Sequence, residues 1–395
     1  MKIAMIIHNQ VSTGPYFKVL EQCVALVQAG HSVTLFATSA TRRLFPHKTM
    51  HEGVEVIEAP DLLWGKLRQG IDLYNTVWRC MLAHKRQFDI VHAIDARPNV
   101  ILTALHIKYW QKIPLILSWW DLFGDSGIAT ERFGALYGKT LGKVEVWFEE
   151  FFRKYADGAT AITSYLAHRL QNMKFPTDRI ITLHVGCNAY LPVPDHTVAR
   201  SALLRLDIGP DDIVLCFIGT IYQSDLNFLF RALDVVRSRT DQPFKILWIG
   251  NHRIEPLLQK AYNIVHAGHL ATMQDVYQHL SAADIALLPF VVNTANRARW
   301  HSKITDYFTM ALPVVTTPVS DFPEIFRHHD CGWMANGTTP EDFAESILMA
   351  LNERTMWHIK GNTAKQYAQT YLDTRSLADT LTHFYTRIAH LAHRV

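Results

Sequence analysis

The sequence predicts an α/β protein built from two doubly wound parallel sheets. Short apolar runs alternate with helical stretches along the whole chain. The alternation stops over Ala189 to Ser201, where Pro192 and Pro194 interrupt the periodicity, and then it restarts. Such a break between two alternating halves indicates an interdomain linker. The chain has 395 residues, of which 49% are hydrophobic, and this is enough material for two domains of ordinary size.

Each half supplies its own set of expected strands. Those of the first half are Ile3–Ile7, Ser32–Ala37, Val54–Glu58, Ile90–Ala93, Leu115–Trp119, Gly158–Ile162 and Ile180–Leu183. Those of the second half are Ile213–Ile218, Lys245–Ile249, Ile264–Ala267, Ile285–Pro289 and Val314–Thr317. We therefore expect an N-terminal domain over 1–190 and a C-terminal domain over 200–372. A terminal helix over about 375–395 is expected to pack back on the first domain.

Charge and cysteine usage limit the classes of partner and compartment. A net charge of +3 suits a phosphate-bearing ligand or an anionic membrane surface, but it is too weak to indicate nucleic acid. The five cysteines are scattered and form no CxxC pair, which is typical of reduced thiols in a cytosolic protein. Because Met1 and Lys2 lead directly into the expected strand Ile3–Ile7, we expect no secretory signal, and no run of 18 apolar residues is present. We expect a cytoplasmic protein that can lie at the inner face of a membrane.

The segment from Leu62 to Arg86 indicates that membrane contact. Its apolar residues recur at helical spacing: Leu67, Ile71, Tyr74, Trp78 and Met81. Its basic residues are expected on the flanks of the same helix: Lys66, Arg68, Arg79, Lys85 and Arg86. A helix packed against the core explains the apolar stripe equally well.

The most informative stretch runs from His301 through Tyr307 to Val315. It predicts a short helix, with Ser302 as N-cap, that leads into a buried strand. Lys303, Asp306 and Tyr307 then share one helix face. The helix N-terminus and Lys303 can hold a diphosphate, and Asp306 can accept hydrogen bonds from ribose hydroxyls. An ordinary surface pair of Lys and Asp is the alternative.

Ligands of open parallel sheets bind beyond the carboxyl ends of the strands. In the second half this rule selects residues that follow successive strands: Gly219, Thr220, Gly250, Asn251, Gly268 and His269. The glycines allow the backbone to approach a ligand closely. Together with Lys303 and Asp306, they outline a nucleotide pocket. Plain turns at strand ends are the alternative for each glycine.

The stretch around Lys303 resembles the helix of retaining glycosyltransferase family 4, with the pattern Ser-Pro-x-Lys-x-x-Glu-Tyr-Met-Ala-x-Gly-x-Pro-Val-Val. Lys303 and Tyr307 match, Asp306 stands where the family has its second Glu, and Pro313–Val315 match outright. Weaker family signatures occur in the same order along nearly the whole chain: Ala29–Val33, Phe88–Ala93, Ala156–Gly158, His184–Asn188, Phe217–Gly219, Trp248–Gly250 and Pro323–Ile325. The resemblance implies the GT-B fold, in which two Rossmann-like doubly wound domains face a central cleft.

The resemblance also implies a retaining, metal-independent hexosyltransferase of polysaccharide or glycoconjugate biosynthesis. It would move a sugar from a UDP- or GDP-linked donor to a glycan, lipid-linked or small-molecule acceptor, without a cofactor. The acceptor would meet the loop that holds Gly14, together with Asp95 and Trp120. Asp121 stands in the catalytic region, where the pair Trp120–Asp121 replaces the family's His-Asp.

Two further departures concern charge. The first Glu of the family's Glu-x7-Glu motif is Ala298 here, and the basic pair that follows Gly219 is missing. Because charge develops on the leaving diphosphate, we expect Arg297, Arg299 and Lys303 to replace that pair. A solvated basic loop is the alternative for the two arginines. A non-catalytic relative that binds sugar or serves as a scaffold is therefore the second hypothesis, and a nucleotide-sugar epimerase is a distant third.

Overall fold

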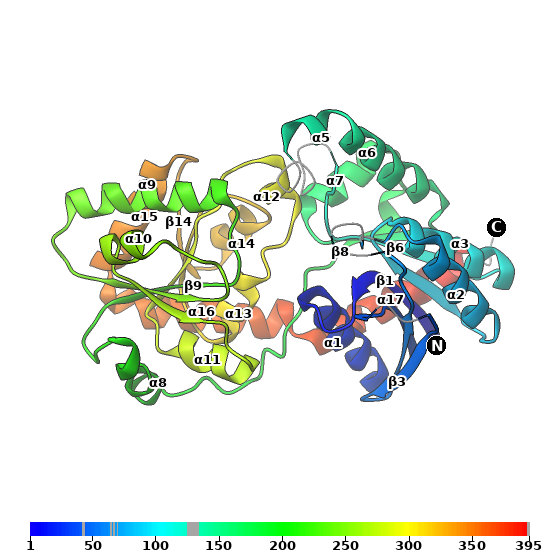
Figure 1. Ribbon diagram of the computed structural model, residues 1–395, viewed down its shortest axis with the longest axis horizontal. Helices are drawn as coiled ribbons and strands as arrows, with labels where there is room; N and C mark the ends of the chain where they lie inside the picture. The colour runs from blue at the N-terminus through cyan, green and yellow to red at the C-terminus, as the bar shows by residue number, and fades with distance from the viewer. Residues whose placement is uncertain (42–43, 64, 66–67, 69, 125–133, 393–395) are drawn as a thin grey trace. The chain divides into compact units, whose positions relative to one another are not determined.

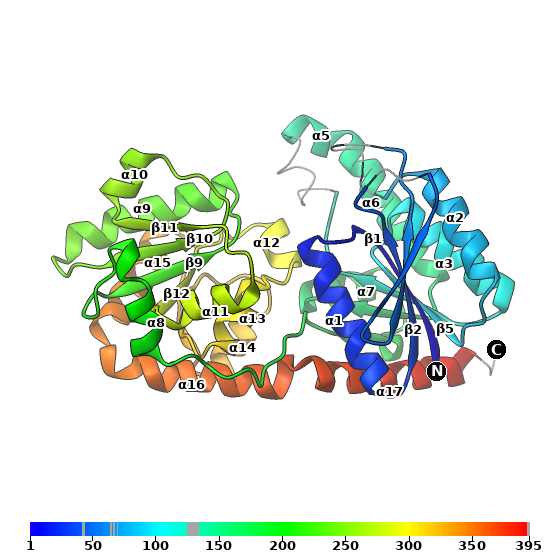
Figure 2. The same ribbon diagram turned by 60° about the horizontal axis from the view of Figure 1, so that its bottom comes forward.

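The computed structural model describes residues 1–395 except 42–43, 64, 66–67, 69, 125–133 and 393–395 (Figure 1). The chain forms two compact units. The first contains Met1–Gly186, Ala298–Trp300 and Thr374–Val395. The second contains Cys187–Arg297 and His301–Asp373. Each unit holds one sheet with helices on both faces (Figures 1 and 2).

The sheet of the first unit has the strand order β3-β4-β2-β1-β5-β6-β7-β8 and is parallel except for β3. Its strands are β1 (Lys2–Gln10), β2 (Ser32–Thr38), β3 (His47–His51), β4 (Val54–Ala59), β5 (Ile90–Ile94), β6 (Leu115–Trp119), β7 (Gly158–Ala161) and β8 (Ile180–Thr182). Its α-helices are α1 (Gly14–Gln28), α2 (Leu73–His84), α3 (Pro98–Gln111), α5 (Ala135–Lys139), α6 (Leu141–Phe151), α7 (Ser164–Asn172) and α17 (Thr374–Ala392).

Two apolar layers hold this sheet, one on each face. Along β1 the side chains alternate: Ile3 and Met5 pack under α1 and α17, whereas Ala4 and Ile6 pack on the opposite face. That opposite face is covered by α2 and α3, and Phe148 of α6 packs against the same cluster. The layer of α2, α3 and α6 is therefore distinct from the layer of α1 and α17.

The sheet of the second unit is wholly parallel, with the order β11-β10-β9-β12-β13-β14. Its strands are β9 (Val214–Ile218), β10 (Lys245–Ile249), β11 (Ile264–Gly268), β12 (Ile285–Leu288), β13 (Val314–Thr316) and β14 (Gly332–Met334). Its α-helices are α8 (His196–Ala202), α9 (Gln223–Arg239), α10 (Pro256–Ala261), α11 (Met273–Ser281), α12 (Thr294–Ala298), α13 (Lys303–Thr309), α14 (Phe322–His328), α15 (Pro340–Asn352) and α16 (Trp357–Tyr367). Helices α9 and α15 pack on one face through Phe228 and Phe343.

The doubly wound α/β class is confirmed, and every expected strand is present in its expected place. Strands β3 and β14 were not expected. β3 is a polar, exposed edge strand without an apolar alternation, and β14 has only three residues. Neither carries the pattern that identifies a strand in a sequence.

Two expectations about local structure are wrong in part. The expected linker of 189–201 includes the start of α8, which is capped by Asp195 and buries Ala199. Among the described residues of the segment Leu62–Arg86, the α-helix covers Leu73–His84, and Asp72 caps its start by accepting the N–H of Tyr74. Lys66 and Leu67 lie outside the described residues.

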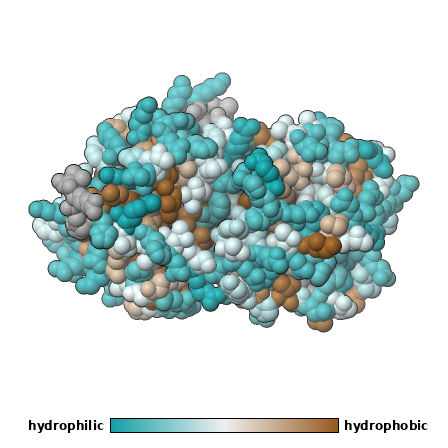
Figure 3. All heavy atoms as spheres, turned by 180° about the vertical axis from the view of Figure 1, so that it is seen from behind, coloured by the Kyte–Doolittle hydropathy of each residue, from teal (hydrophilic) through white to brown (hydrophobic). Residues whose placement is uncertain are grey.

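The surface is of mixed character. Figure 3 shows a face on which hydrophilic side chains predominate and apolar ones form scattered patches. All five cysteines are free thiols. Within the described residues, no helix is both long and apolar enough to cross a membrane.

Candidate active site

Three strand ends of the second unit meet at one edge of its sheet. The N–H of Gly219, after β9, donates to the carbonyl of Ile249 (2.7 Å), and the N–H of Gly250 donates to the carbonyl of Gly268 (2.8 Å). Gly250 has a φ of +139°, and a Cβ there would lie 2.9 Å from the Gly219 carbonyl oxygen. The close approach of these strand ends therefore requires glycine at 250. The edge is open, and Thr220, Asn251 and His269 are exposed along it.

Helix α13 brings Lys303 to this edge. Its Nζ lies 3.7 Å, and its Cε 3.4 Å, from the place of a Cβ on Gly219. The same ammonium lies 5.3 Å from the ring centroid of Phe217, at the end of β9. The structure thus brings together Lys303 and Gly219, two residues that are 84 positions apart. A phosphate that approaches the Gly219 backbone would meet the ammonium at once.

Ser302 directly precedes this helix, as expected for an N-cap, but it does not cap it. Ser302 has helical backbone angles, and its side chain makes no capping hydrogen bond. The helix begins at Lys303 and has only seven residues. His301, two residues before the helix, stacks on Phe290 (3.7 Å between ring centroids), and its Nε2 hydrogen-bonds to the carbonyl of Asn296. The cationic character of the site therefore rests on the Lys303 ammonium and not on a long helix dipole.

Asp306 occupies the inner part of the site. It is buried, and the hydroxyl of Tyr277 from α11 lies 3.5 Å from its Oδ1. One turn of sequence separates Asp306 from Lys303, so both project from the same short helix. A carboxylate beside a cation and a tyrosine hydroxyl can accept hydrogen bonds from a polyhydroxyl ligand such as a ribose.

His266 is a member of this edge that the sequence did not indicate. Its Nδ1 accepts the N–H of Gly268 (3.1 Å), so its Nε2 carries the proton and donates to the carbonyl of His252 (2.8 Å). One imidazole thus joins the ends of β10 and β11. Burial and the neighbouring His266 lower the pKa of His252. The hydrogen bond from His266 to the His252 carbonyl positions the loop in which Asn251 lies.

Asp225, in the first turn of α9, stands near where the family resemblance would put the basic pair. Its carboxylate is buried and accepts the N–H of Val291 (2.8 Å) and the side-chain amide of Asn296 (3.0 Å). It holds the segment that leads into α12 and Arg297. A buried carboxylate that accepts two amides is a positioning group, and no local sequence pattern reveals such a partner.

The segment that holds Ala298 is anchored by its backbone. Ala298 is fully buried, and its carbonyl accepts the hydroxyl of Thr163 (2.9 Å). Trp300 stacks on His184, with 4.0 Å between ring centroids. Arg299 lies within this segment of the first unit, whereas the exposed Arg297 belongs to the second unit, as does Lys303. A Glu at position 298 would bury a carboxylate, which costs free energy, and the small side chain of Ala298 avoids that cost.

In the first unit, β5 and β6 bring three of the expected acceptor-side residues together. Asp95 has a φ of +63° at the end of β5, and its Oδ1 accepts the N–H of Trp120 (2.9 Å) and of Asp121 (3.3 Å). Asp95 is 4% exposed, so its carboxylate holds the loop of Trp120 and Asp121 instead of facing solvent. Burial, with the charge of Asp121 second, raises the pKa of Asp95 to about 7.

A second buried carboxylate supports the same loop and was not expected. Glu149 of α6 accepts the N–H of Phe123 (3.0 Å), and burial raises its pKa. Arg153, one helical turn further, lies 3.9 Å from the ring centroid of Trp119. Trp119 is in the core, whereas Trp120 is half-buried. In the sequence, the i, i+4 spacing of Glu149 and Arg153 is the feature that could have indicated that these two side chains are neighbours on one helix face.

Gly14 begins α1, and its lack of a side chain has no steric cause within the described residues. A Cβ on Gly14 would meet nothing within 4 Å. Ser12, two residues before, has a φ of +71°, and the Thr13 hydroxyl donates to the carbonyl of Gln10 (2.7 Å). These contacts shape the turn that leads from β1 into α1.

The basic flank expected over Leu62–Arg86 is wrong for three of its residues. Arg68 pairs with the carboxylate of Asp61 (3.3 Å) and donates to the carbonyl of Ala40 (3.1 Å). Arg79 is fully buried and donates to the carbonyl of Ile7 (2.8 Å) and the hydroxyl of Thr38 (3.0 Å). Arg86 donates two hydrogen bonds of 2.8 Å to the carboxylate of Glu55. Their charges are satisfied inside the unit.

Comparison with known proteins agrees with this architecture. Residues 13–186 match the family described as Glycosyl transferase 4-like domain, and residues 212–353 match Glycosyl transferases group 1. The sequence has no significant match among curated proteins.

Solved structures resemble the chain along almost its whole length. Sucrose-phosphate synthase from Thermosynechococcus elongatus is 14% identical, with a TM-score of 0.75, and 98% of this chain and 99% of that one are covered. Anabaena HepE, solved with UDP and glucose, is 15% identical, with a TM-score of 0.68 and coverages of 98% and 100%. WaaG, a glycosyltransferase involved in lipopolysaccharide biosynthesis, is 15% identical, with a TM-score of 0.66 and coverages of 96% and 99%. These likenesses show the GT-B fold.

Proposed function

The chain is a glycosyltransferase with a glycosyl transferase 4-like domain and a group 1 domain, and we propose that it moves a sugar from a UDP- or GDP-linked donor with retention of configuration. The acceptor is a glycan, a lipid-linked sugar or a small molecule. The reaction needs no metal or cofactor. The five free thiols support a reducing, cytoplasmic compartment.

The observation that carries this proposal is the place of Lys303 beside Gly219. The Lys303 ammonium lies beside the end of β9, where Gly219 leaves the backbone accessible, and in our proposal the diphosphate of the donor binds there. In our proposal Lys303 neutralises the charge that grows on the diphosphate as the glycosidic bond breaks. We assign Arg297 and Arg299 the same role, which is to offset the negative charge of the leaving diphosphate.

The remaining roles follow from chemistry at the two sheet edges. Asp306 accepts the ribose hydroxyls, and the backbone around Thr220, Asn251, Gly268 and His269 encloses the nucleotide. On the acceptor side, Gly14 and Trp120 contact the acceptor, while Asp95 positions Asp121. The Asp95 carboxylate accepts the backbone N–H groups of Trp120 and Asp121, so we assign Asp95 a positioning role.

The transfer itself balances without a protein base. The acceptor hydroxyl forms a bond to the anomeric carbon on the face from which the diphosphate leaves. The bond between that carbon and the phosphate oxygen breaks, and the diphosphate takes the electron pair. The hydroxyl proton passes to a diphosphate oxygen. Fixed positive charge at Lys303 is then the main contribution that the protein makes to this step.

A UDP-linked donor is favoured by one neighbour. The HepE structures contain UDP, UDP and glucose, or UDP-glucose. The base contacts of this chain would come from the His266-supported loop ends, which offer backbone groups near Gly268.

Ala298 favours a second candidate, a non-catalytic sugar-binding or scaffolding relative. The buried methyl group removes a carboxylate that family members carry there. The two candidates differ in donor turnover. We expect a UDP- or GDP-sugar to raise the melting temperature and to release nucleoside diphosphate slowly without acceptor. Stabilisation without any release, even with acceptor extract, would favour the scaffold.

A further inference from the structure

The two helix layers of the first unit expose different side chains. Ten large apolar residues of α2, α3, α5 and α6 are more than one-third exposed: Leu73, Val77, Met81, Leu102, Tyr109, Trp110, Leu136, Leu141, Val144 and Trp147. On α1 and α17, which cover the other face, Phe17 alone among the described residues reaches that exposure. An apolar excess on one layer of a folded unit indicates a surface that contacts something other than water.

The charges of this layer are also one-sided. Helices α2, α3 and α5 contain neither Asp nor Glu. The glutamates of α6 are engaged: Glu145 pairs with Arg97 (3.1 Å), Glu150 pairs with Arg169 (2.7 Å), and Glu149 is buried. Five exposed lysines lie on or beside these helices: Lys85, Lys112, Lys139, Lys143 and Lys154. None of the five forms an ion pair with a carboxylate of the described residues.

Aromatic rings on this layer have the character of residues at a lipid–water boundary. Trp110 is 60% exposed and rests on His84, with 4.2 Å between ring centroids. Trp147 is 57% exposed and stacks on Phe151 at 4.9 Å. Tryptophan and tyrosine favour the headgroup region of a bilayer because one part of the ring is apolar and another is polar.

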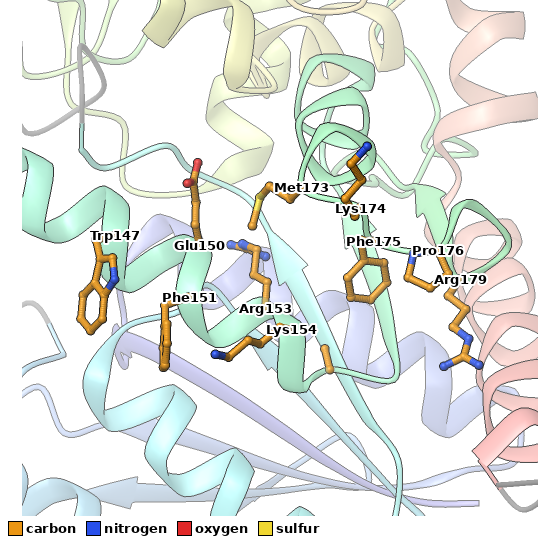
Figure 4. Close-up of a pocket in the computed structure, with 11 residues that line it drawn as sticks. Trp147, Glu150, Phe151, Arg153, Lys154, Met173, Lys174, Phe175, Pro176 and Arg179 are labelled. Carbon is orange, nitrogen blue, oxygen red and sulfur yellow. The ribbon is translucent and has the colours of Figure 1, made fainter.

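A cavity of about 520 Å³ adjoins the same layer where α6 ends (Figure 4). Its lining combines the rings of Trp147, Phe151 and Phe175 with the cations Arg153, Lys154, Lys174 and Arg179, and its one carboxylate is Glu150. In Figure 4, Arg153 and Lys154 lie between the rings of Phe151 and Phe175.

The polar groups of this cavity favour an anion. Arg153 is 1% exposed, and its Nε and Nη2 have no hydrogen-bond partner among the described residues. The Glu150 carboxylate is already bound by Arg169 through two hydrogen bonds, of 2.9 and 2.7 Å. Buried donors without partners beside apolar rings suit the phosphate of an amphipathic molecule.

We propose that the outer face of α2, α3, α5 and α6 docks on an anionic lipid bilayer and that a lipid phosphate enters the cavity beside Trp147. The inference goes beyond the proposed function, because bilayer binding requires no sugar transfer. The surface retains Met81 and Lys85 of the Leu62–Arg86 segment, but not Arg68, Arg79 and Arg86, which are bound within the unit. A second copy of this chain is a poorer occupant, since lysine-bearing faces would repel each other.

The test is co-sedimentation of the whole chain with vesicles. One set holds equal parts of phosphatidylglycerol and phosphatidylcholine, and the other holds phosphatidylcholine alone. We expect binding to the anionic set at low salt and release as salt rises. The variant Val144→Ser/Trp147→Ser should lower partitioning roughly tenfold, because it removes buried apolar area. Leu257→Ser, at a still more exposed leucine on α10, is the control and should bind like the wild type.

A second pair of measurements tests the cavity. Lys154→Ala/Lys174→Ala should weaken binding to anionic vesicles and leave any binding to neutral ones unchanged. Inorganic phosphate at a matched ionic strength should compete only weakly, because it lacks the acyl chains. Full competition by phosphate would mean a free-anion site and would overturn the lipid assignment.

Three other results would contradict the proposal: no sedimentation at low salt, equal binding to both vesicle sets, or an equal loss in Leu257→Ser. A dimer in sedimentation equilibrium that Val144→Ser/Trp147→Ser dissociates would make this face a contact between copies. Nucleoside diphosphate release is measured on the same preparations. A variant that no longer binds vesicles but still releases nucleoside diphosphate would separate this inference from the proposed function.

Discussion

The hydroxyl of Tyr307 accepts a hydrogen bond from the backbone N–H of Ile218 (3.0 Å). This bond joins α13 to the last residue of β9, and both residues are buried. It fixes the distance between Lys303, at the start of α13, and Gly219, which follows Ile218. A tyrosine that has no contact with a donor thus sets where the ammonium meets the diphosphate.

Replacing Tyr307 by Phe should therefore cost both stability and donor binding. The N–H of Ile218 would lose its partner inside the second unit, and an unsatisfied buried donor costs about 1–3 kcal/mol. We expect a lower denaturation midpoint and a higher KM for the donor. Tyr371→Phe is the matched control, because Tyr371 is half-exposed in the same unit. Wild-type behaviour of Tyr307→Phe in both assays would show that the bond does not position α13.

Asp306 should contribute to nucleotide affinity. Asp306→Ala is expected to weaken nucleoside diphosphate binding by about 1.5–3 kcal/mol, the worth of charge-assisted hydrogen bonds. Asp306→Glu should retain part of that affinity, because the family carries Glu at this position. Isothermal calorimetry measures both. Unchanged affinity in Asp306→Ala would place the ribose elsewhere.

Gly250→Ala tests the close approach of the strand ends. The new Cβ would lie 2.9 Å from the Gly219 carbonyl oxygen, at a φ of +139°. We expect a loss of roughly 1–3 kcal/mol in unfolding free energy and weaker donor binding. Gly209→Ala serves as control, since its Cβ would meet only the flexible Asp212 side chain, at 3.4 Å. A harmless Gly250→Ala would mean that the strand ends can separate without cost.

The raised pKa of Asp95 predicts a pH dependence of stability. Its pKa is about 7 in the folded chain and near 3.8 ordinarily, so the folded state retains a proton that the unfolded state releases. The resulting stabilisation is fully present below about pH 4 and is lost as pH rises through 7. Asp95→Asn imitates the protonated form and still accepts the N–H of Trp120.

Thermal unfolding at pH 5 and pH 8 checks this prediction. Relative to wild type, Asp95→Asn should gain stability between pH 5 and pH 8. Asp241→Asn, at an exposed carboxylate, should follow the wild type. If Asp95→Asn and wild type lost stability in parallel as pH rose, the Asp95 carboxyl would not hold the proton.

The strands were predictable because burial on both faces of a parallel sheet leaves continuous apolar runs, as in Val314–Thr316. The edge strand β3 pairs with β4 through its backbone, and its side chains are mostly polar. No continuous apolar run therefore indicates it in the sequence. The nearness of Lys303 to Gly219 followed from strand-end topology and the resemblance. The supporting groups Asp225, His266 and Glu149 were missed, because each acts through backbone groups distant in sequence.

The most direct test of the account is nucleoside diphosphate release from nucleotide-sugar donors by wild type and Lys303→Ala, with and without acceptor extract. Because charge grows on the diphosphate in the transition state, Lys303→Ala should turn over on the order of 10²-fold more slowly, with a smaller loss of ground-state affinity. Lys303→Arg should restore only part of the rate, and Lys260→Ala, at an exposed lysine of α10, should match the wild type. Equal release from wild type and Lys303→Ala would contradict the role assigned to Lys303.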